Sequence, residues 1–160
     1  MNLFRNVKYG IGNLIKWFPI IWKDRDWDHW FLYIILQFKL KQMEKLQRKY
    51  GHSVNSEKYA DQIKTAVLIL DRLIKDDYFS KSYENHEKKW GETEMKFTPL
   101  EENPELYSVD FVTEKAVTNK QKEQERKEKM RLLHHEEMLK QQDLDYLFKH
   151  MRKHIQGWWD

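Results

Sequence analysis

The stretch from Trp22 to Gly51 limits the possible folds more than any other part of the sequence. Charged residues and tryptophans alternate over 22–30, and the run Phe-Leu-Tyr-Ile-Ile-Leu follows at 31–36. Apolar residues recur there at steps of three and four, as in a helix, and the positions between them are apolar as well. A helix that is hydrophobic on every side has to be surrounded by other elements. We therefore predict that this stretch forms the central helix of an all-α protein.

The two ends of the central helix carry residues that are common at helix termini. Asp24 or Asp26 can cap its start, because a short carboxylate accepts hydrogen bonds from the free amides of the first turn. Gly51 is predicted to end it in the left-handed conformation.

A second helix is predicted over residues 56–79, with Ser53, Asn55 or Ser56 as its cap. It carries the most regular apolar stripe of the chain, formed by Ile63, Ala66, Val67, Leu70, Leu73 and Ile74. The loop that joins it to the central helix is short, so the two helices are expected to be antiparallel neighbours. The polar residues 80–90 are predicted either to continue this helix or to form a third short helix, closed by Gly91.

The last third of the chain is predicted to form a connector and one long helix. Residues 91–109 carry Gly91, Pro99 and Pro104, and we interpret them as an ordered connector. Its expected anchors are Phe97, Leu100, Leu106 and Tyr107. The last helix is predicted over 110–156, and its middle, 119–131, is almost entirely charged or polar.

The predicted fold class is an all-α helical bundle of four to five helices with a long charged C-terminal helix. The 160 residues are expected to form a single helical domain, since the length suits one domain and only five Gly and three Pro are present. The expected core residues are Trp30, Phe31, Ile34, Ile35, Phe38, Ile63, Val67, Leu70, Ile74, Leu144, Phe148 and Met151.

The N-terminal segment 1–22 is basic and amphipathic. Residues 1–23 contain four Lys or Arg and no acid, and 14–22 is apolar apart from Lys16. This run is too short to span a bilayer and lacks a small-residue cleavage site, so we predict neither a transmembrane segment nor a secretory signal. The segment can lie on a membrane surface. We favour the alternative that it covers the central helix, with Pro19 turning the chain before Trp22.

Composition and motifs argue against several kinds of chemistry. The chain has no Cys, no G-x-S-x-G elbow and no Gly-rich phosphate loop, so we predict a protein that is not an enzyme and needs no cofactor. His134 and Glu137 have the spacing of a di-iron motif in reversed order and without a second copy, so no metal site is predicted. The basic residues of 119–131 alternate with Glu, and the net charge is only +3, so we expect no duplex nucleic acid as partner.

Cations and aromatic residues gather near two points of the chain, and this pattern suggests a site for a small anionic, nucleotide-like ligand. Guanidinium groups bind phosphate, and indole or imidazole rings stack on bases. The candidate ligand-binding residues are Trp22, Lys23, Arg25 and His29 at the head of the central helix, and Lys149, His150, Arg152, Lys153, His154, Trp158 and Trp159 at the end of the last helix. We expect the ligand between these two groups, within one chain or across a subunit interface. Affinity is expected to rise as the pH falls and the histidines gain charge.

Three segments together resemble a family of small helical proteins of tailed bacteriophages. They are Trp-Lys-Asp-Arg-Asp-Trp-Asp-His-Trp at 22–30, Asp-Arg-Leu-Ile-Lys-Asp-Asp-Tyr at 71–78 with Lys-Lys-Trp-Gly at 88–91, and Asp-Leu-Asp-Tyr-Leu-Phe-Lys-His at 143–150 with Trp-Trp-Asp at 158–160. The resemblance implies a phage protein in the cytoplasm of an infected bacterium. It assigns no catalytic residue. Some small phage proteins act against host defence, and by that analogy we predict sequestration of a nucleotide-type immune signal.

Two other interpretations remain open. The chain can be an interaction or structural protein that docks on another protein through the charged segment 119–140 and binds no small molecule. A metal-dependent hydrolase is the third. Under each of them we expect a homo-oligomer, because long charged helices, an apolar start and a C-terminal Trp pair are surfaces that a symmetric partner would cover.

Overall fold

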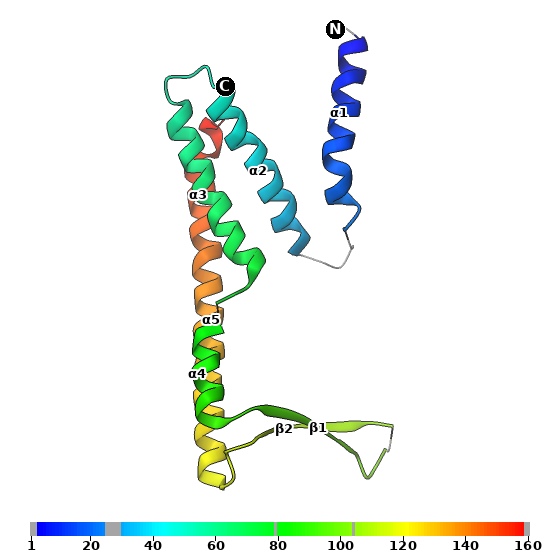
Figure 1. Ribbon diagram of the computed structural model, residues 1–160, viewed down its shortest axis with the longest axis vertical. Coiled ribbons are helices and arrows are strands. Elements are labelled where there is room, and N and C mark those ends of the chain that lie inside the picture. The colour runs from blue at the N-terminus through cyan, green and yellow to red at the C-terminus, as the bar shows by residue number, and fades with distance from the viewer. Residues whose placement is uncertain (1–2, 25–29, 79, 104, 159–160) are drawn as a thin grey trace. The chain divides into compact units, whose positions relative to one another are not determined.

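The computed structural model describes residues 3–24, 30–78, 80–103 and 105–158 (Figure 1). In these ranges the elements are, in chain order, α1 (Leu3–Ile21), α2 (Trp30–Tyr50), α3 (Ser56–Lys75), α4 (Ser80–Trp90), β1 (Thr93–Pro99), β2 (Tyr107–Thr113), α5 (Asn119–His154) and the 3-10 turn η1 (Ile155–Gly157). The mostly helical fold class with a long C-terminal helix is thus confirmed. The chain divides into two compact units, Met1–Asp76 with Asp143–Asp160, and Asp77–Gln142.

The core of the first unit lies between α2, α3 and the last turns of α5. α2 and α3 pack as antiparallel neighbours: Gln37 Nε2 donates to Val67 O, whereas Arg48, further along α2, pairs with Glu57 at the start of α3. Eight residues of α3 are buried, and they include the predicted Ile63, Val67 and Leu70. Asp76 ends α3 in the left-handed region, with φ of 52°, and its amide donates to Arg72 O.

The last turns of α5 pack against α3 through polar contacts as well as apolar ones. Arg72 and Asp143 form a two-pronged ion pair, with Arg72 Nε 2.8 Å from Asp143 Oδ2. Leu147 is fully buried, whereas Phe148, which we predicted to be core, is 59% exposed. The core prediction is therefore wrong here by one position, since Leu147 rather than Phe148 is buried. The helix is rotated so that Asp143 and His150, rather than Phe148, reach α3.

α1 differs from the prediction at its end. Pro19 lies inside the helix and does not turn the chain, because the helix continues to Ile21 and the amide of Trp22 donates to Phe18 O at 2.9 Å. The Trp17 ring meets the Phe38 ring of α2 edge-on at 4.9 Å. Most large apolar side chains of α1 are nevertheless exposed, so the helix covers little of α2. Leu32 of α2 is 66% exposed, and the predicted enclosure of α2 on every side is wrong for the described residues.

The second unit joins α4, a β-hairpin and residues 119–142 of α5. Lys89 Nζ and Trp90 Nε1 each donate to the Glu128 carboxylate at 2.7 Å. The hydrogen bond from Lys89, followed by that from Trp90, lowers the pKa of Glu128 to about 2. Gly91 ends α4 at a φ of 83°, as the predicted closure of this helix requires.

The segment predicted as a connector is a two-stranded antiparallel sheet. β1 and β2 pair from Thr93↔Thr113 to Pro99↔Tyr107, and α5 begins at Asn119 rather than at residue 110. The four expected anchors Phe97, Leu100, Leu106 and Tyr107 are 42–61% exposed, so they do not anchor this segment in a core. One face of the hairpin presents apolar pairs, among them Met95↔Phe111 and Phe97↔Val109.

Candidate functional site

The predicted ligand-binding residues have different environments in the structure. Trp22 and Lys23 are exposed after the end of α1, and Arg25, His29 and Trp159 lie outside the described residues. Near the end of α5, Lys149, Arg152 and Lys153 are exposed, whereas His150 and His154 are half-buried. Trp158 is buried, with 1% of its surface exposed.

Trp158 and His150 hold the end of the chain against α3. The Trp158 indole Nε1 donates to Gln62 Oε1 at 3.1 Å, and the His150 ring nitrogen Nε2 lies 2.8 Å from Gln62 O. The two rings lie 6.1 Å apart, and the His154 ring follows at 4.9 Å from His150. A buried indole with a satisfied N–H is a structural contact rather than an exposed surface for a base. The ring-stacking role predicted for Trp158 therefore does not fit its position.

The described structure does not bring the two predicted groups together within one chain. Gln47 Nε2 donates to Trp158 O, which puts the end of the chain beside the C-terminal end of α2. Trp22 and Lys23 precede the opposite end of this helix, whose 21 residues span about 30 Å. Trp158 thus lies beside the C-terminal end of α2, whereas the predicted site used the N-terminal end of this helix.

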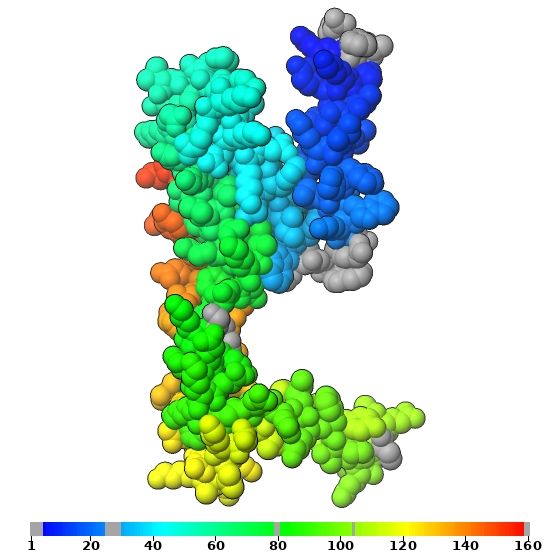
Figure 2. Space-filling model, in the orientation of Figure 1, coloured from blue at the N-terminus to red at the C-terminus, as the bar shows by residue number. Residues whose placement is uncertain are grey.

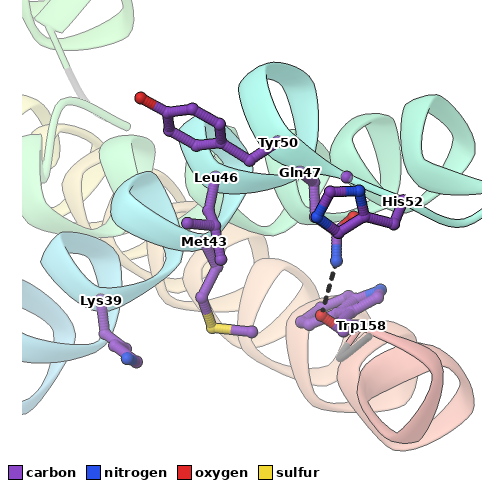
Figure 3. A pocket seen from close by; sticks show the side chains of 8 residues that line it. Lys39, Met43, Leu46, Gln47, Tyr50, His52 and Trp158 are labelled. Carbon is purple, nitrogen blue, oxygen red and sulfur yellow. Dashed lines mark hydrogen bonds between the residues drawn. The ribbon is translucent and has the colours of Figure 1, made fainter.

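A groove lies at this meeting point, at the C-terminal end of α2 (Figure 3). Its volume is about 430 Å³, and it is lined by Lys39, Met43, Leu46, Gln47, Tyr50, Gly51, His52 and Trp158. Met43, Leu46 and Tyr50 follow one another along one face of α2 because their spacings are three and four residues. Most of the lining is apolar or aromatic, as in many small-molecule sites.

Gln47 contributes a polar group that the protein leaves unpartnered. The residue is 5% exposed, and its Oε1 has no hydrogen-bond partner among the described residues. The orientation of the amide is fixed, because Trp158 O at 3.1 Å requires the NH₂ group on its side. Buried polar atoms in native proteins nearly always have a partner. Gln47 Oε1 is therefore a buried, unused acceptor on a residue that lines the groove.

One lysine of the lining gives the groove positive charge. Lys39 is exposed and lines the groove, whereas Lys49, whose Nζ lies 5.0 Å from the centre of the Tyr50 ring, is not part of the lining. Tyr50 is 57% exposed, so part of its surface is accessible to a ligand. An acceptor, an aromatic ring and an ammonium group together suit a ligand that carries an N–H donor, a planar ring and an anionic group.

Gly51 shapes the groove by its small size rather than by a left-handed backbone. Its φ is not positive, so the conformation predicted for it is wrong. A Cβ at this position would lie 2.3 Å from Ser56 Oγ and 2.5 Å from Gln47 O. The loop therefore needs glycine because the chain passes so close to the first turn of α3.

His154 is less easily protonated than an ordinary histidine. Burial lowers its pKa below 6.5, and the positive charges of His150, Lys153 and Lys58 lower it further. The predicted gain of ligand affinity on acidification from pH 8 to 6 relied on histidines that charge near neutrality. His154 stays neutral over more of that range, so it is a weak source of such a gain.

The second unit holds a buried pair that the sequence analysis did not identify. His86 Nε2 and Glu125 Oε1 are 3.6 Å apart, both are buried, and neither atom has a hydrogen-bond partner among the described residues. This pair has no third ligand for a metal, since no group of three His, Asp or Glu in the described ranges could hold an ion. The pair therefore forms no metal site among the described residues.

Comparison with known proteins identified no related family, protein or structure. No protein-family model matches the sequence, and no curated protein or solved structure matches it. The resemblance to tailed-bacteriophage proteins thus stays a prediction, and the candidate site stands on the residues of this chain. Within the described residues, no helix is both long and apolar enough to span a bilayer.

Proposed function

We propose that this chain is a non-enzymatic binding protein that takes a small, anionic, base-containing ligand in the groove beside the C-terminal end of α2. The observation that carries the proposal is the buried Gln47 Oε1, held in place by Trp158 and left without a donor among the described residues. A ring N–H or exocyclic amine of a base supplies such a donor. Tyr50 offers a ring face for stacking, and Lys39 offers charge for a phosphate.

The site was predicted between the head of α2 and the end of α5; the proposal moves it to the C-terminal end of α2 and keeps its chemistry. Only Trp158 is common to the predicted residue set and the lining of the groove. Sequestration of an immune signal in an infected bacterium is the biological role that the phage resemblance implies for such binding. The groove contacts support the binding step, and the biological role needs its own test in infected cells.

Calorimetric titration of the whole protein tests the binding step. The titrants are cyclic dinucleotides, ADP-ribose and its cyclic isomers, and inorganic phosphate as an anion without a base. We expect at least one base-containing titrant to bind tighter than phosphate. If none binds tighter than about 1 mM, which corresponds to about −4 kcal/mol, the proposal is wrong.

A matched pair of lysine variants tests the place of binding. Lys39→Ala removes an ammonium group from the groove, and Lys45→Ala removes one from an exposed position of α2 that does not line it. Both changes alter the net charge equally, so long-range attraction falls equally in both. We expect a loss of affinity of about tenfold for Lys39→Ala alone, which corresponds to one charge-assisted contact. Equal losses in the two variants would argue against the groove.

The second candidate is a protein-interaction function, and the hairpin favours it over the charged segment that the sequence analysis proposed. Met95, Phe97, Val109 and Phe111 share one hairpin face and are 45–62% exposed. An exposed apolar strand face is a common site of association. If a second copy covers this face, Phe97→Ser should lower the mass found by light scattering, and Thr98→Ser on the other face should not.

A further inference from the structure

α1 presents one continuous apolar face that the described residues do not cover. Its members are Val7, Ile11, Leu14, Ile15, Phe18, Ile21 and Trp22, each between 52% and 73% exposed. They recur at steps of three and four and so form a single stripe along the helix. The contact between α1 and α2 uses Trp17, which is half-buried against Phe38, and leaves this stripe open. The side chains of α1 are drawn in blue in Figure 2.

The other side of α1 is basic. Arg5, Lys8 and Lys16 line one shallow depression on the helix together with Tyr9, Gly12 and Asn13. Residues 1–23 contain no Asp or Glu. The helix therefore combines an apolar stripe that includes an exposed Trp with a polar face whose charges are all positive.

We propose that α1 lies in the surface of an anionic lipid bilayer. Helices of this composition bury their apolar face at the boundary between headgroups and acyl chains, and their lysines and arginines meet acidic lipid. Trp22, which is 73% exposed beside Phe18, suits the interfacial region, where indole rings concentrate. The inference uses no residue of the groove, so it stands or falls independently of the proposed function.

Charge favours a bilayer over a second copy of the chain as the partner of this face. Two copies of α1 packed through the same stripe would bring two sets of like charges to one interface, with no acid in the segment to compensate them. An acidic membrane supplies the opposite charge along the whole length of the helix. An acidic membrane thus buries the apolar face of α1 and binds its basic face.

Vesicle co-sedimentation of the full chain tests this inference. The vesicles contain phosphatidylcholine alone or with about one third phosphatidylserine, at low and at high salt. We expect binding to the acidic vesicles, weaker binding at high salt, and still weaker binding to phosphatidylcholine alone. The paired change Lys8→Gln with Lys16→Gln should weaken binding to acidic vesicles by about tenfold or more.

Neighbouring residues on opposite faces of α1 give the matched control. Leu14→Gln with Ile15→Gln adds polar groups to the stripe and should weaken binding at least about tenfold, whereas Asn13→Gln should leave it unchanged. All three side chains are exposed, so we expect the unfolding midpoint to stay the same.

Three results would overturn the inference. The first is failure of the wild-type chain to bind acidic vesicles at low salt. The second is equal binding by the Leu14→Gln, Ile15→Gln variant. The third is that this variant converts an oligomer into a monomer by light scattering while the wild type ignores vesicles, which would show that a second copy covers the face.

Discussion

α1 and α3 have similar lengths and similarly strong apolar stripes, yet their environments differ. α3 buries eight of its 20 residues, including Ala60, Ile63, Ala66 and Leu70 with no exposed surface. α1 has 19 residues, and none of its residues 5–21, whose burial the structure describes, is buried. α1 also contains Gly10 and Gly12, where an added Cβ would meet nothing within 4 Å. Amphipathic periodicity therefore identifies a face that needs a partner without identifying the partner.

The partner of α3 is assembled from distant parts of the chain. α2 covers it on one side, and Arg72, Gln62 and Tyr59 meet the last turns of α5 and the residues after them. No such partner reaches the apolar face of α1 among the described residues. Equivalent substitutions in the two regions should therefore have unequal effects on stability.

Removal of the indole rings is expected to give the largest difference. Trp158→Ala should lower the free energy of unfolding by about 3–5 kcal/mol, because the ring is fully buried and its N–H is bonded to Gln62. Trp22→Ala, at a 73% exposed position, should change it by less than about 0.5 kcal/mol. Urea unfolding of the two variants measures both values. Similar losses of unfolding free energy in the two variants would contradict the difference in burial between the two regions.

A leucine pair makes the same comparison with identical chemistry. Leu70→Ala should cost about 2–5 kcal/mol, since Leu70 is fully buried in α3. Leu14→Ala in α1 replaces a 70% exposed side chain and should cost less than about 0.5 kcal/mol. Helix propensity changes equally in both variants, so the difference reports burial alone. A loss above about 1 kcal/mol for Leu14→Ala would show that its face is covered in solution.

Acidification is expected to give the smallest effect and to act where the chain end meets α3. The pKa of His154 is lowered by burial, so its neutral form is favoured in the folded state. As the pH falls, this histidine therefore takes up a proton in the unfolded chain before it does so in the folded one. The contribution of neutral His154 to stability is complete above a pH of about 6.5 and declines as the pH falls below that value. Urea unfolding at about pH 7 and about pH 5.5 should show the decline.

Two histidine variants separate this contribution from the rest of the pH dependence. His154→Gln should reduce the decline, whereas His134→Gln, at an exposed position of the same helix, should retain it. If both variants behave like the wild type, His154 does not govern stability in this range.

Much of the helical fold could be predicted because its signals are local. The stripe of α3 and the positive φ of Gly91 both follow from residue types at fixed spacing. The hairpin was missed although Met95, Phe97, Val109 and Phe111 alternate as in strands, because the prolines suggested a connector. The prediction placed Phe148 in the core because the residue is hydrophobic. The contacts of Asp143 and His150 with α3 fix the rotation of the helix, and they cannot be read from the sequence.

The candidate site was less predictable because its residues are distant in sequence and ordinary in type. Lys39 and Gln47 are unremarkable on a solvated helix face, and only the packing of Trp158 turns them into a groove. Whether an acceptor lacks a partner depends on the folded structure, so no sequence motif marks Gln47. The high density of cations and aromatic residues near the chain end was a partial signal, since it includes Trp158.

Nuclear magnetic resonance of the nitrogen-15-labelled protein during ligand titration tests the groove most directly. The titrant is whichever base-containing compound binds in calorimetry, and the reporters are the side-chain amide of Gln47 and the indole N–H groups of Trp158 and Trp22. We expect the Gln47 and Trp158 signals to shift and the Trp22 signal to stay, because only the first two residues line the groove. A shift of Trp22 without shifts of Gln47 and Trp158 would contradict the account and return the site to the residues before α2.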